Sequence, residues 1–389
     1  MNETDGPTIF ISAAEPSADR LGQALIHATC RICPSARFVG VAGPAMARAG
    51  CRPIFDMTRH AAMLLGAVGA ARRAFRMTRI VNAHLKRYRF DAAVLIDSPA
   101  LHLPLAEHVR SAGVPVMYYV APQMWAWGAR RIEKLRNRVD KLAVVLPFEE
   151  EYFRSRGVDA TFVGHPLIDK LANVPVDESA VATLRNGAEH VVALLPGSRK
   201  HVVKEVLPGQ IETAERIVRA IPDVRFVASA ANPQVSSIVR SAVDTCPIPI
   251  HIHEGPHTEL IKVADLVLVA SGTTTIEVAF FRKPMIVMYN ASRLFYHVVG
   301  RWLVKTPHLS LPNILAGREL VPEFMPFYTS TEPIADQAVE LLCSDEMRAE
   351  MSQELGRVVA PLNTGNAERK VADMLLDMIE KHGNNRQTH

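Results

Sequence analysis

VVALLPGSRKHVVKE, residues 191–205, combines a short apolar run, a tight turn and a basic segment that leads into a helix. The β-branched and leucine residues before Pro196 are typical of a strand buried in a parallel sheet. Gly197 ends this strand and allows the backbone to approach a ligand closely. Ser198 is a candidate N-cap, and Arg199 adds positive charge to the free N–H groups of a helix N-terminus. The stretch predicts an anion site, or else an ordinary strand-to-helix turn with surface charge.

The same alternation of strands and helices continues on both sides. We expect strands at residues 8–12, 38–41, 91–96, 114–120, 142–146 and 161–163 before this stretch, and at 225–228, 248–253, 266–270 and 284–289 after it. Short apolar runs separated by helical segments indicate a doubly wound parallel sheet, here in two copies. The chain is therefore predicted to be an α/β protein.

At 389 residues, 48% of them apolar, the chain suits two domains with separate cores. The predicted parts are an N-terminal domain at 1–170, a polar linker at 171–182, a second domain at 183–355, and a C-terminal helix and tail at 356–389 that can pack back on the first domain. Residues 333–382 look helical, and the chain from Gly383 onward is expected to be a disordered polar tail.

Composition argues against several classes of protein. No run of about 18 uncharged apolar residues is present, so no membrane-spanning helix is predicted, and the N-terminus lacks the signal-peptide pattern. The five cysteines are expected to be reduced thiols of a cytoplasmic protein, because Cys30 and Cys33 have no second pair. No metal and no cofactor are predicted. The net charge of +4 is mild, and nucleic-acid binding is not expected.

Positive charge is concentrated in residues 57–90, which contain no Asp or Glu. Arginines alternate there with apolar side chains, and the candidates for membrane or acceptor contact are Met63, Leu64, Leu65, Val68, Arg72, Arg73 and Arg76. A basic helix with an apolar edge can lie in a membrane interface. The alternative is an amphipathic helix whose apolar side covers the sheet.

Carboxylates follow two predicted strands of the first half. Glu15, Ser17 and Asp19 come after the first strand, where ligands bind in open α/β sheets, although Ser17 or Asp19 could simply cap the next helix. Asp97 follows the strand at 91–96, with Ser98 as a candidate cap. Asp97 would act as a general base if it is functional; the residues alone favour a turn carboxylate.

A second glycine turn follows the apolar strand LVLVA at 266–270. Ser271, Gly272 and Thr273 again offer hydroxyl and backbone groups at a helix N-terminus, which suits phosphate. Glu277 in the first turns of that helix can reach a ribose hydroxyl, or it can be a favourable charge near a helix start.

Two further loops carry unusual residues. Residues 121–127, APQMWAW, place two tryptophans after a strand, where they either line a pocket or pack beneath the loop. Residues 311–323, LPNILAGRELVPE, are dense in proline, glycine and polar groups and are interpreted as a functional loop.

Taken together, the motifs resemble the lipid-A-disaccharide synthase family. The matching segments are AEPSADRLG, YYVAPQMWAW, LPFEEEYF, FVGHPLID, LLPGSR, ASGTTTIE and SLPNILAGRELVPEF, which run in order from about Ile11 to Arg369. The resemblance implies a GT-B glycosyltransferase, in which two Rossmann-like domains face a cleft. It also implies transfer, with inversion, of a diacylated glucosamine from UDP to diacylglucosamine 1-phosphate, at the cytoplasmic membrane face.

The same resemblance implies roles for individual residues. Asp97 would be the catalytic base, and Glu15 is a second catalytic candidate. Donor binding is implied for Gly197, Ser198, Arg199, Ser271, Gly272, Thr273, Glu277, His165, Asn313 and Glu319. No cofactor is implied, the inner membrane surface is the expected partner, and a homodimer is compatible with the family.

The chain departs from the family pattern on what we interpret as the acceptor side. The usual Ala-Pro-Asp-Phe-Asn after the base becomes SPALH, which puts Ala100 and His102 in place of Asp and Asn, and Pro326 replaces a glutamine. Alternatives are a UDP-sugar epimerase or hydrolase on the same fold, a paralogue with another acceptor, and a protein that only binds lipid or UDP-sugar.

Overall fold

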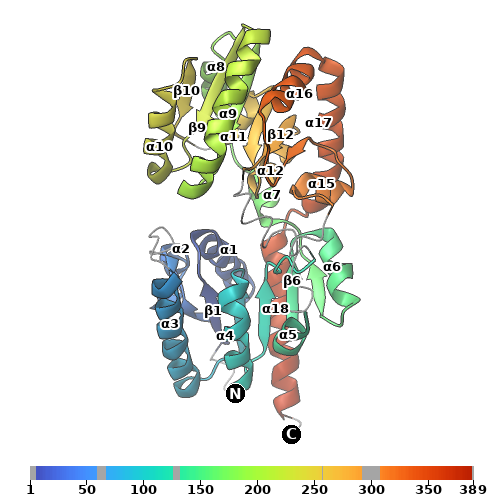
Figure 1. Ribbon diagram of the computed structural model, residues 1–389. Helices are drawn as coiled ribbons and strands as arrows, with labels where there is room; N and C mark the ends of the chain where they lie inside the picture. The colour runs from blue at the N-terminus through green and yellow to red at the C-terminus, as the bar shows by residue number, and fades with distance from the viewer. Residues whose placement is uncertain (1–5, 59–66, 126–131, 256, 291–306, 388–389) are drawn as a thin grey trace. The chain divides into compact units, whose positions relative to one another are not determined.

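The computed structural model describes residues 6–58, 67–125, 132–255, 257–290 and 307–387. The chain divides into two compact units, one formed by Met1–Asp169 with Leu362–His389 and the other by Lys170–Pro361 (Figure 1). Each unit contains one sheet in which every pair of neighbouring strands is parallel. The predicted α/β class with two doubly wound sheets and a helical C-terminus is confirmed.

The first sheet has the strand order β3-β2-β1-β4-β5-β6-β7. Its strands are β1 (Thr8–Ala13), β2 (Arg37–Val41), β3 (Arg52–Phe55), β4 (Ala92–Ile96), β5 (Val116–Tyr119), β6 (Lys141–Val144) and β7 (Ala160–Phe162). Its helices are α1 (Pro16–Ile32), α2 (Pro44–Arg48), α3 (Ala67–Arg87), α4 (Pro99–Ser111), α5 (Ile132–Arg138), α6 (Pro147–Arg154) and α18 (Ala367–Gln387), and α7 (Pro166–Leu171) crosses the boundary between the units. The order reverses between β1 and β4, where open sheets of this kind bind ligands.

Alternate residues of these strands build two cores, one on each face of the first sheet. Phe10, Leu95 and Tyr118 belong to the cluster that α3, α4 and α5 cover. On the opposite face, α1 packs closely enough that a Cβ on Gly22 would lie 3.3 Å from Cδ1 of Ile96.

The helix α18 completes this second face. It lies beside α1 and contacts β4 and β6 (Figure 1). The Asp169 carboxylate receives hydrogen bonds from the backbone N–H groups of Thr364, Gly365 and Ala367, and so fixes the start of α18. The expected disordered tail from Gly383 is wrong for the described residues, because α18 continues to Gln387.

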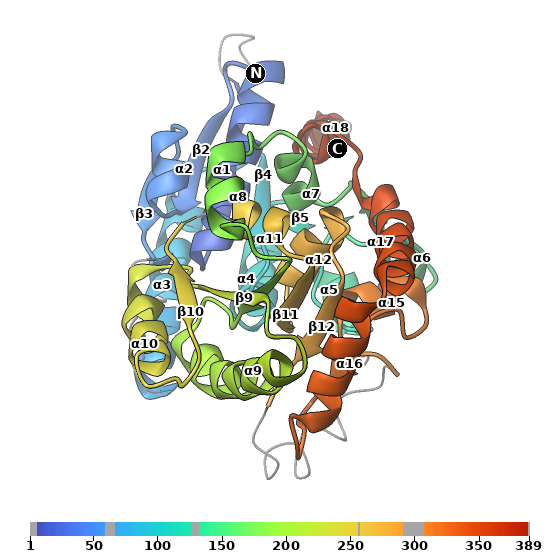
Figure 2. The ribbon, with the colours of Figure 1, turned by 90° about the horizontal axis from the view of Figure 1, so that it is seen from above.

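The second sheet has the order β10-β9-β8-β11-β12-β13, with the same kind of reversal between β8 and β11. Its strands are β8 (His190–Leu195), β9 (Val224–Ser229), β10 (Ile250–His253), β11 (Leu266–Ala270), β12 (Met285–Met288) and β13 (Glu323–Phe324). Its helices are α8 (Glu178–Arg185), α9 (Lys200–Ala220), α10 (Pro233–Val243), α11 (His257–Val263), α12 (Thr274–Phe280), α15 (Leu311–Ala316), α16 (Glu332–Cys343) and α17 (Asp345–Val359), followed by the 3-10 helix Ala360–Leu362. The helices α9 and α16 lie side by side over one core (Figure 2).

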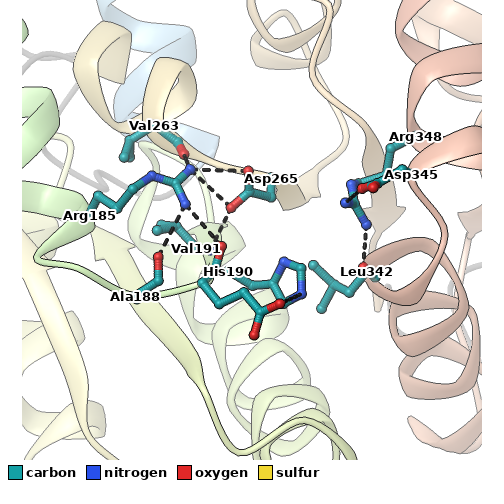
Figure 3. A network of polar contacts seen from close by, with 10 residues as sticks. Arg185, Ala188, His190, Val191, Val263, Asp265, Leu342, Asp345 and Arg348 are labelled. Atoms are coloured by element: carbon teal, nitrogen blue, oxygen red, sulfur yellow. Dashed lines mark hydrogen bonds and ion pairs between the residues drawn. The ribbon is translucent and has the colours of Figure 1, made fainter.

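A polar network aligns β8 with β11 at their amino ends (Figure 3). The Asp265 carboxylate accepts hydrogen bonds from the N–H of Val191 at 2.8 Å and from Nη2 of Arg185 at 3.1 Å. The same Arg185 nitrogen donates to the carbonyl of Val263 at 2.8 Å. Because both strands are anchored at this edge, the turns at their carboxyl ends are held in register.

Two stretches predicted as loops contain helices. α8 begins at Glu178, inside the expected linker, where Asp177 caps it by accepting from two backbone N–H groups. α15 occupies the first half of the expected functional loop at 311–323, because Pro312 stands at the start of a helix and Gly317, with φ of 66°, ends it.

Candidate functional site

Two turns that follow neighbouring strands lie side by side in the second unit. These are residues 196–199 after β8 and 271–273 after β11, hereafter the paired corners. β8 and β11 pair in parallel along their length, so both turns leave the sheet at one edge. A Cβ atom on Gly197 would lie 3.8 Å from the Cβ of Ala270. The structure thus brings together the two turns that the sequence assigns to phosphate.

The first corner has a backbone shape that suits glycine. Gly197 has φ of 107°, and a Cβ there would lie 3.1 Å from Cγ1 of Val202. Asn232 supports the turn from the next loop, because its Nδ2 donates to the carbonyl of Ser198 at 3.0 Å. The Oδ1 of Asn232 accepts from the N–H of Gln234 and caps α10. No pattern in the sequence around the turn singles out Asn232 for this role.

α9 starts directly behind this corner, at Lys200. Arg199 is its N-cap residue and no side chain makes the capping hydrogen bond, so the prediction of Ser198 as N-cap is wrong. The basic segment after the turn is already helical, and Val203 in its first turn is buried in the core. The amino end of a 21-residue helix without a side-chain cap favours an anion.

Tyr289, which follows β12, lies near both Arg199 and Glu205 of α9. Burial raises the pKa of the Tyr289 hydroxyl, the charge of Glu205 and a hydrogen bond to it act in the same direction, and the Arg199 guanidinium opposes them. Arg199 therefore lies in a small network of charged and hydroxyl groups at the carboxyl edge of the sheet.

The second corner is tightened by its own helix. The N–H and Oγ1 of Thr275 both donate to the carbonyl of Gly272, at 3.1 and 2.7 Å. Gly272 and Thr273 are exposed, and Ser271 is half-buried. Burial raises the pKa of Glu277, and the charge of Lys170 opposes the shift.

Asn313 is buried and its amide is fully used inside the 311–323 segment. Its Oδ1 accepts from the N–H groups of Leu320 and Val321, while its Nδ2 donates to the carbonyl of Val321 and to Glu323. Glu319 is exposed in the same segment. Asn313 is therefore placed to shape the loop, and its role towards a donor stays a prediction.

Two candidate catalytic carboxylates follow the switch-point strands of the first sheet. β1 pairs with β4 in parallel, with Ala13 opposite Ile96, so Glu15 and Asp97 emerge at the same edge. Both side chains are half-buried. Among the described residues, the Asp97 carboxylate makes no hydrogen bond or ion pair, which leaves its oxygens available to an acceptor hydroxyl.

The backbone at Asp97 is unusual. Asp97 has φ of 54° and Ser98 has φ of 49°, both in the left-handed region that non-glycine residues rarely adopt. Ser98 occupies the N-cap position of α4, but its hydroxyl makes no capping bond. Ser98 thus occupies the predicted N-cap position, but its side chain does not make the capping hydrogen bond that the prediction implied.

Other first-unit residues have different partners from those expected. Asp19 is 3% exposed and accepts from the backbone N–H groups of Gly43, Ala45 and Met46, so it caps α2 and does not cap α1. Neither Asp19 nor the exposed Ser17 occupies the N-cap of α1, which is Glu15.

His165 lies in the first unit, whereas the other donor-binding candidates lie in the second unit. Its backbone N–H donates to the carbonyl of Leu362. Burial lowers the pKa of its imidazole to about 4, against the opposing charge of Asp169. Its donor-binding role stays a prediction.

Trp125 is half-buried and packs against α6. Its indole N–H donates to Glu149 at 3.0 Å and its ring meets Phe148 edge-on, with 5.1 Å between centroids. Burial raises the pKa of Glu149 to about 7, against the hydrogen bonds that it accepts. The packing interpretation therefore holds for Trp125, whereas Trp127 lies outside the described residues.

The basic segment forms α3, and its two sides differ. Met77 and Val81 are buried in the core, whereas Arg72, Arg76 and Phe75 are exposed, Phe75 by 73%. Arg73 is half-buried. The remaining candidates Met63, Leu64 and Leu65, and the side chain of Val68, lie outside the described residues.

Within the described residues, no three His, Cys, Asp or Glu side chains lie close enough to hold a metal ion. The letters HExxH occur at residues 253–257, but they span the end of β10 and the start of α11, so they lack the helical spacing of a zinc site. In the same ranges, no helix is long and apolar enough to cross a bilayer.

Comparison with known proteins identifies the relatives of this chain. A family model described as lipid-A-disaccharide synthetase matches residues 9–375. A lipid-A-disaccharide synthase of Nitrosococcus oceani is 33% identical over 385 residues, covering 97% of this chain and 98% of the relative. One from Azotobacter vinelandii is 35% identical over 379 residues, covering 96% and 98%.

Solved structures share the fold at low sequence identity. A structure titled as a putative UDP-N-acetylglucosamine 2-epimerase from Listeria monocytogenes has a TM-score of 0.66 and 14% identity, covering 94% of both chains. MurG from Acinetobacter baumannii has a TM-score of 0.58 and 12% identity, covering 96% of this chain and 99% of its own. At these identities the likeness concerns the fold alone.

Proposed function

This chain belongs to the lipid-A-disaccharide synthase family and is a hexosyltransferase, and we propose that it moves a diacylated glucosamine from UDP to diacylglucosamine 1-phosphate. The acceptor hydroxyl oxygen attacks the anomeric carbon while the bond from that carbon to the diphosphate breaks. The configuration inverts, UDP leaves with the bonding electron pair, and a β-1,6 disaccharide forms.

The observation that carries the donor half is that the paired corners follow two strands paired in parallel and so lie at one edge of the second sheet. The start of α9, where Arg199 is the N-cap residue, and the exposed turn around Gly272 follow paired parallel strands and so lie at one sheet edge. Such an arrangement suits a diphosphate and stabilises the negative charge that develops on it as the bond breaks. Glu277 is assigned to the ribose.

For the acceptor half, we assign proton removal to Asp97. Its half-buried carboxylate has no hydrogen-bond or ion-pair partner among the described residues, and it stands at the switch point of the first sheet. The proton lost by the attacking hydroxyl passes to this carboxylate. Glu15 at the same edge is the competing candidate.

The donor assignment predicts a specific loss on Arg199→Ala. Removing a charged hydrogen-bond donor from the diphosphate is expected to raise the Kd for UDP about 10–100-fold. Calorimetric titration of UDP measures this effect. Lys204→Ala, an exposed cation one turn further along α9, is the matched control and should leave the Kd unchanged.

The reaction itself is tested with UDP-diacylglucosamine, in the presence and absence of diacylglucosamine 1-phosphate. The transferase proposal requires that UDP release and disaccharide formation both depend on the acceptor. Equal UDP release without acceptor would indicate a hydrolase, and folded protein that binds UDP but gives no product would be only a binder.

We further propose that the exposed side of α3 contacts an anionic membrane. Arg72, Arg76 and Arg79 recur at helical spacing on this side, around the 73% exposed Phe75. Cationic side chains attract acidic lipid headgroups, and an aromatic ring can enter the interface between headgroups and acyl chains. The cytoplasmic membrane face is the proposed location.

Charge reversal tests this surface. Arg72→Glu with Arg76→Glu is expected to weaken partition onto vesicles containing phosphatidylglycerol about tenfold or more, because each cation contributes to attraction at the surface. Sedimentation with vesicles measures the bound fraction. Lys134→Glu with Arg136→Glu on α5 makes the same change in net charge; an equal loss there would mean that α3 has no special role.

A further inference from the structure

The carbonyl oxygen of Asp97 accepts two short hydrogen bonds. Nδ1 of His102 and the hydroxyl of Tyr118 each lie 2.6 Å from it. A carbonyl can only accept, so Nδ1 of His102 must carry the hydrogen. One residue of α4 and one of β5 therefore hold the peptide group that follows Asp97 in place.

The other ring nitrogen of His102 is also used. Burial lowers the pKa of His102 to about 4, so the ring is neutral near pH 7 and its Nε2 is an acceptor. The Ser12 hydroxyl lies 2.9 Å from Nε2 and donates to it. Both His102 and Ser12 are 0% exposed. His102 is thus buried beside Asp97 and offers no surface of its own to an acceptor.

These bonds act where the backbone is strained. Asp97 and Ser98 are consecutive non-glycine residues with positive φ, a conformation that persists only where the surroundings impose it. Without His102 and Tyr118, the part-buried carbonyl of Asp97 would lose both of these donors, and the turn would lose two contacts that hold it in place.

We propose that His102 is a positioning residue, which acts with Ser12 and Tyr118 to lock the Asp97–Ser98 turn and thereby hold the Asp97 carboxylate in the geometry for proton transfer. This inference rests on the proposed role of Asp97 as the base. The three side chains come from β1, α4 and β5, so the turn at the end of β4 is supported from its neighbouring strands and its own helix.

The decisive variant is His102→Phe, which keeps a buried ring and removes both hydrogen bonds. We expect kcat to fall about tenfold or more, because small displacements of a catalytic group are costly, while the Kd for UDP stays unchanged. His102→Asn should restore part of kcat, since its amide nitrogen stands at the place of Nδ1 and can donate to the Asp97 carbonyl. Thr29→Val removes another buried hydrogen bond of the first unit and is the control for stability alone.

A double-mutant cycle separates positioning from general destabilisation. In an Asp97→Asn background, His102→Phe should lower kcat no further, because residues that act through one group are not additive. A full additional loss there would overturn the inference. So would a folded His102→Phe protein with kcat within about twofold of the parent, since positioning requires a larger effect.

Ser12→Ala and Tyr118→Phe decide the question if His102→Phe does not fold, because each removes one hydroxyl with little change of shape. Lowered kcat at constant UDP affinity in either variant supports the inference, and unchanged kcat in both overturns it. If Asp97→Asn itself keeps full activity, the assignment of the base fails. If Asp97→Asn is inactive and these variants are fully active, only the role of His102 fails.

Discussion

Asp97→Asn is expected to lower kcat about 10²–10⁴-fold, the usual contribution of a general base, with the Kd for UDP unchanged. The amide keeps the shape of the side chain but cannot accept a proton. Because the carboxylate has no hydrogen-bond or ion-pair partner among the described residues, the substitution should also leave the melting temperature close to that of the parent. Product formation at saturating donor, together with calorimetric titration of UDP, measures both quantities.

Two further variants show whether the loss of activity is specific to Asp97. Glu107→Gln, on the exposed side of α4, changes the charge by the same amount and should retain kcat. Glu15→Gln tests the competing carboxylate, and a larger loss there would move the base assignment to Glu15. If Asp97→Asn instead abolished UDP binding, Asp97 would belong to the donor side or to the fold.

Gly40→Ala is expected to be the most destabilising single-methyl change in the first sheet. A Cβ on Gly40 would lie 1.7 Å from the carbonyl oxygen of Ile11 in β1, and within 2.9 Å of its nitrogen. β2 must then move away from β1 at a point where its register with β3 is already irregular. The expected cost is about 3 kcal/mol or more, the upper range for overpacking in a core.

Calorimetry measures this effect as a lowered melting temperature, by roughly 6–12 °C for a unit of this size. Gly383→Ala in α18 is the matched control, because a Cβ there meets no atom within 4 Å and alanine favours a helix. An unchanged melting temperature for Gly40→Ala would mean that the two strands separate there without cost.

The features that the sequence predicted are local ones. The apolar strands, the two glycine turns and the alternation of strands with helices depend on a few consecutive residues, and the parallel order of such elements is strongly restricted. Each of the paired corners was predicted from an apolar strand, a glycine turn and a following helix N-terminus, since ligands bind at that edge of a parallel sheet.

The features that the sequence missed depend on partners far along the chain. Asp19 caps a helix 25 residues later, and His102 pairs with Ser12 across 90 residues. No local pattern distinguishes such a side chain from a helix cap or a surface group. α15 is different, because Pro312 and Gly317 are ordinary start and stop signals that the polar character of the segment obscured.

The fixed start of α18 has a consequence for how the chain can be divided. The first unit is interrupted after Asp169 and resumes at Leu362, so the second unit is an insertion within it. A gene fragment that stops at Asp169 omits the helix beside α1 and uncovers the part of that sheet face, over β4 and β6, which α18 contacts. Excising residues 170–361 and rejoining the ends keeps that helix, since the carbonyl of Leu362 already accepts from the N–H of His165. Deletion work on this chain should therefore remove the middle and spare both termini.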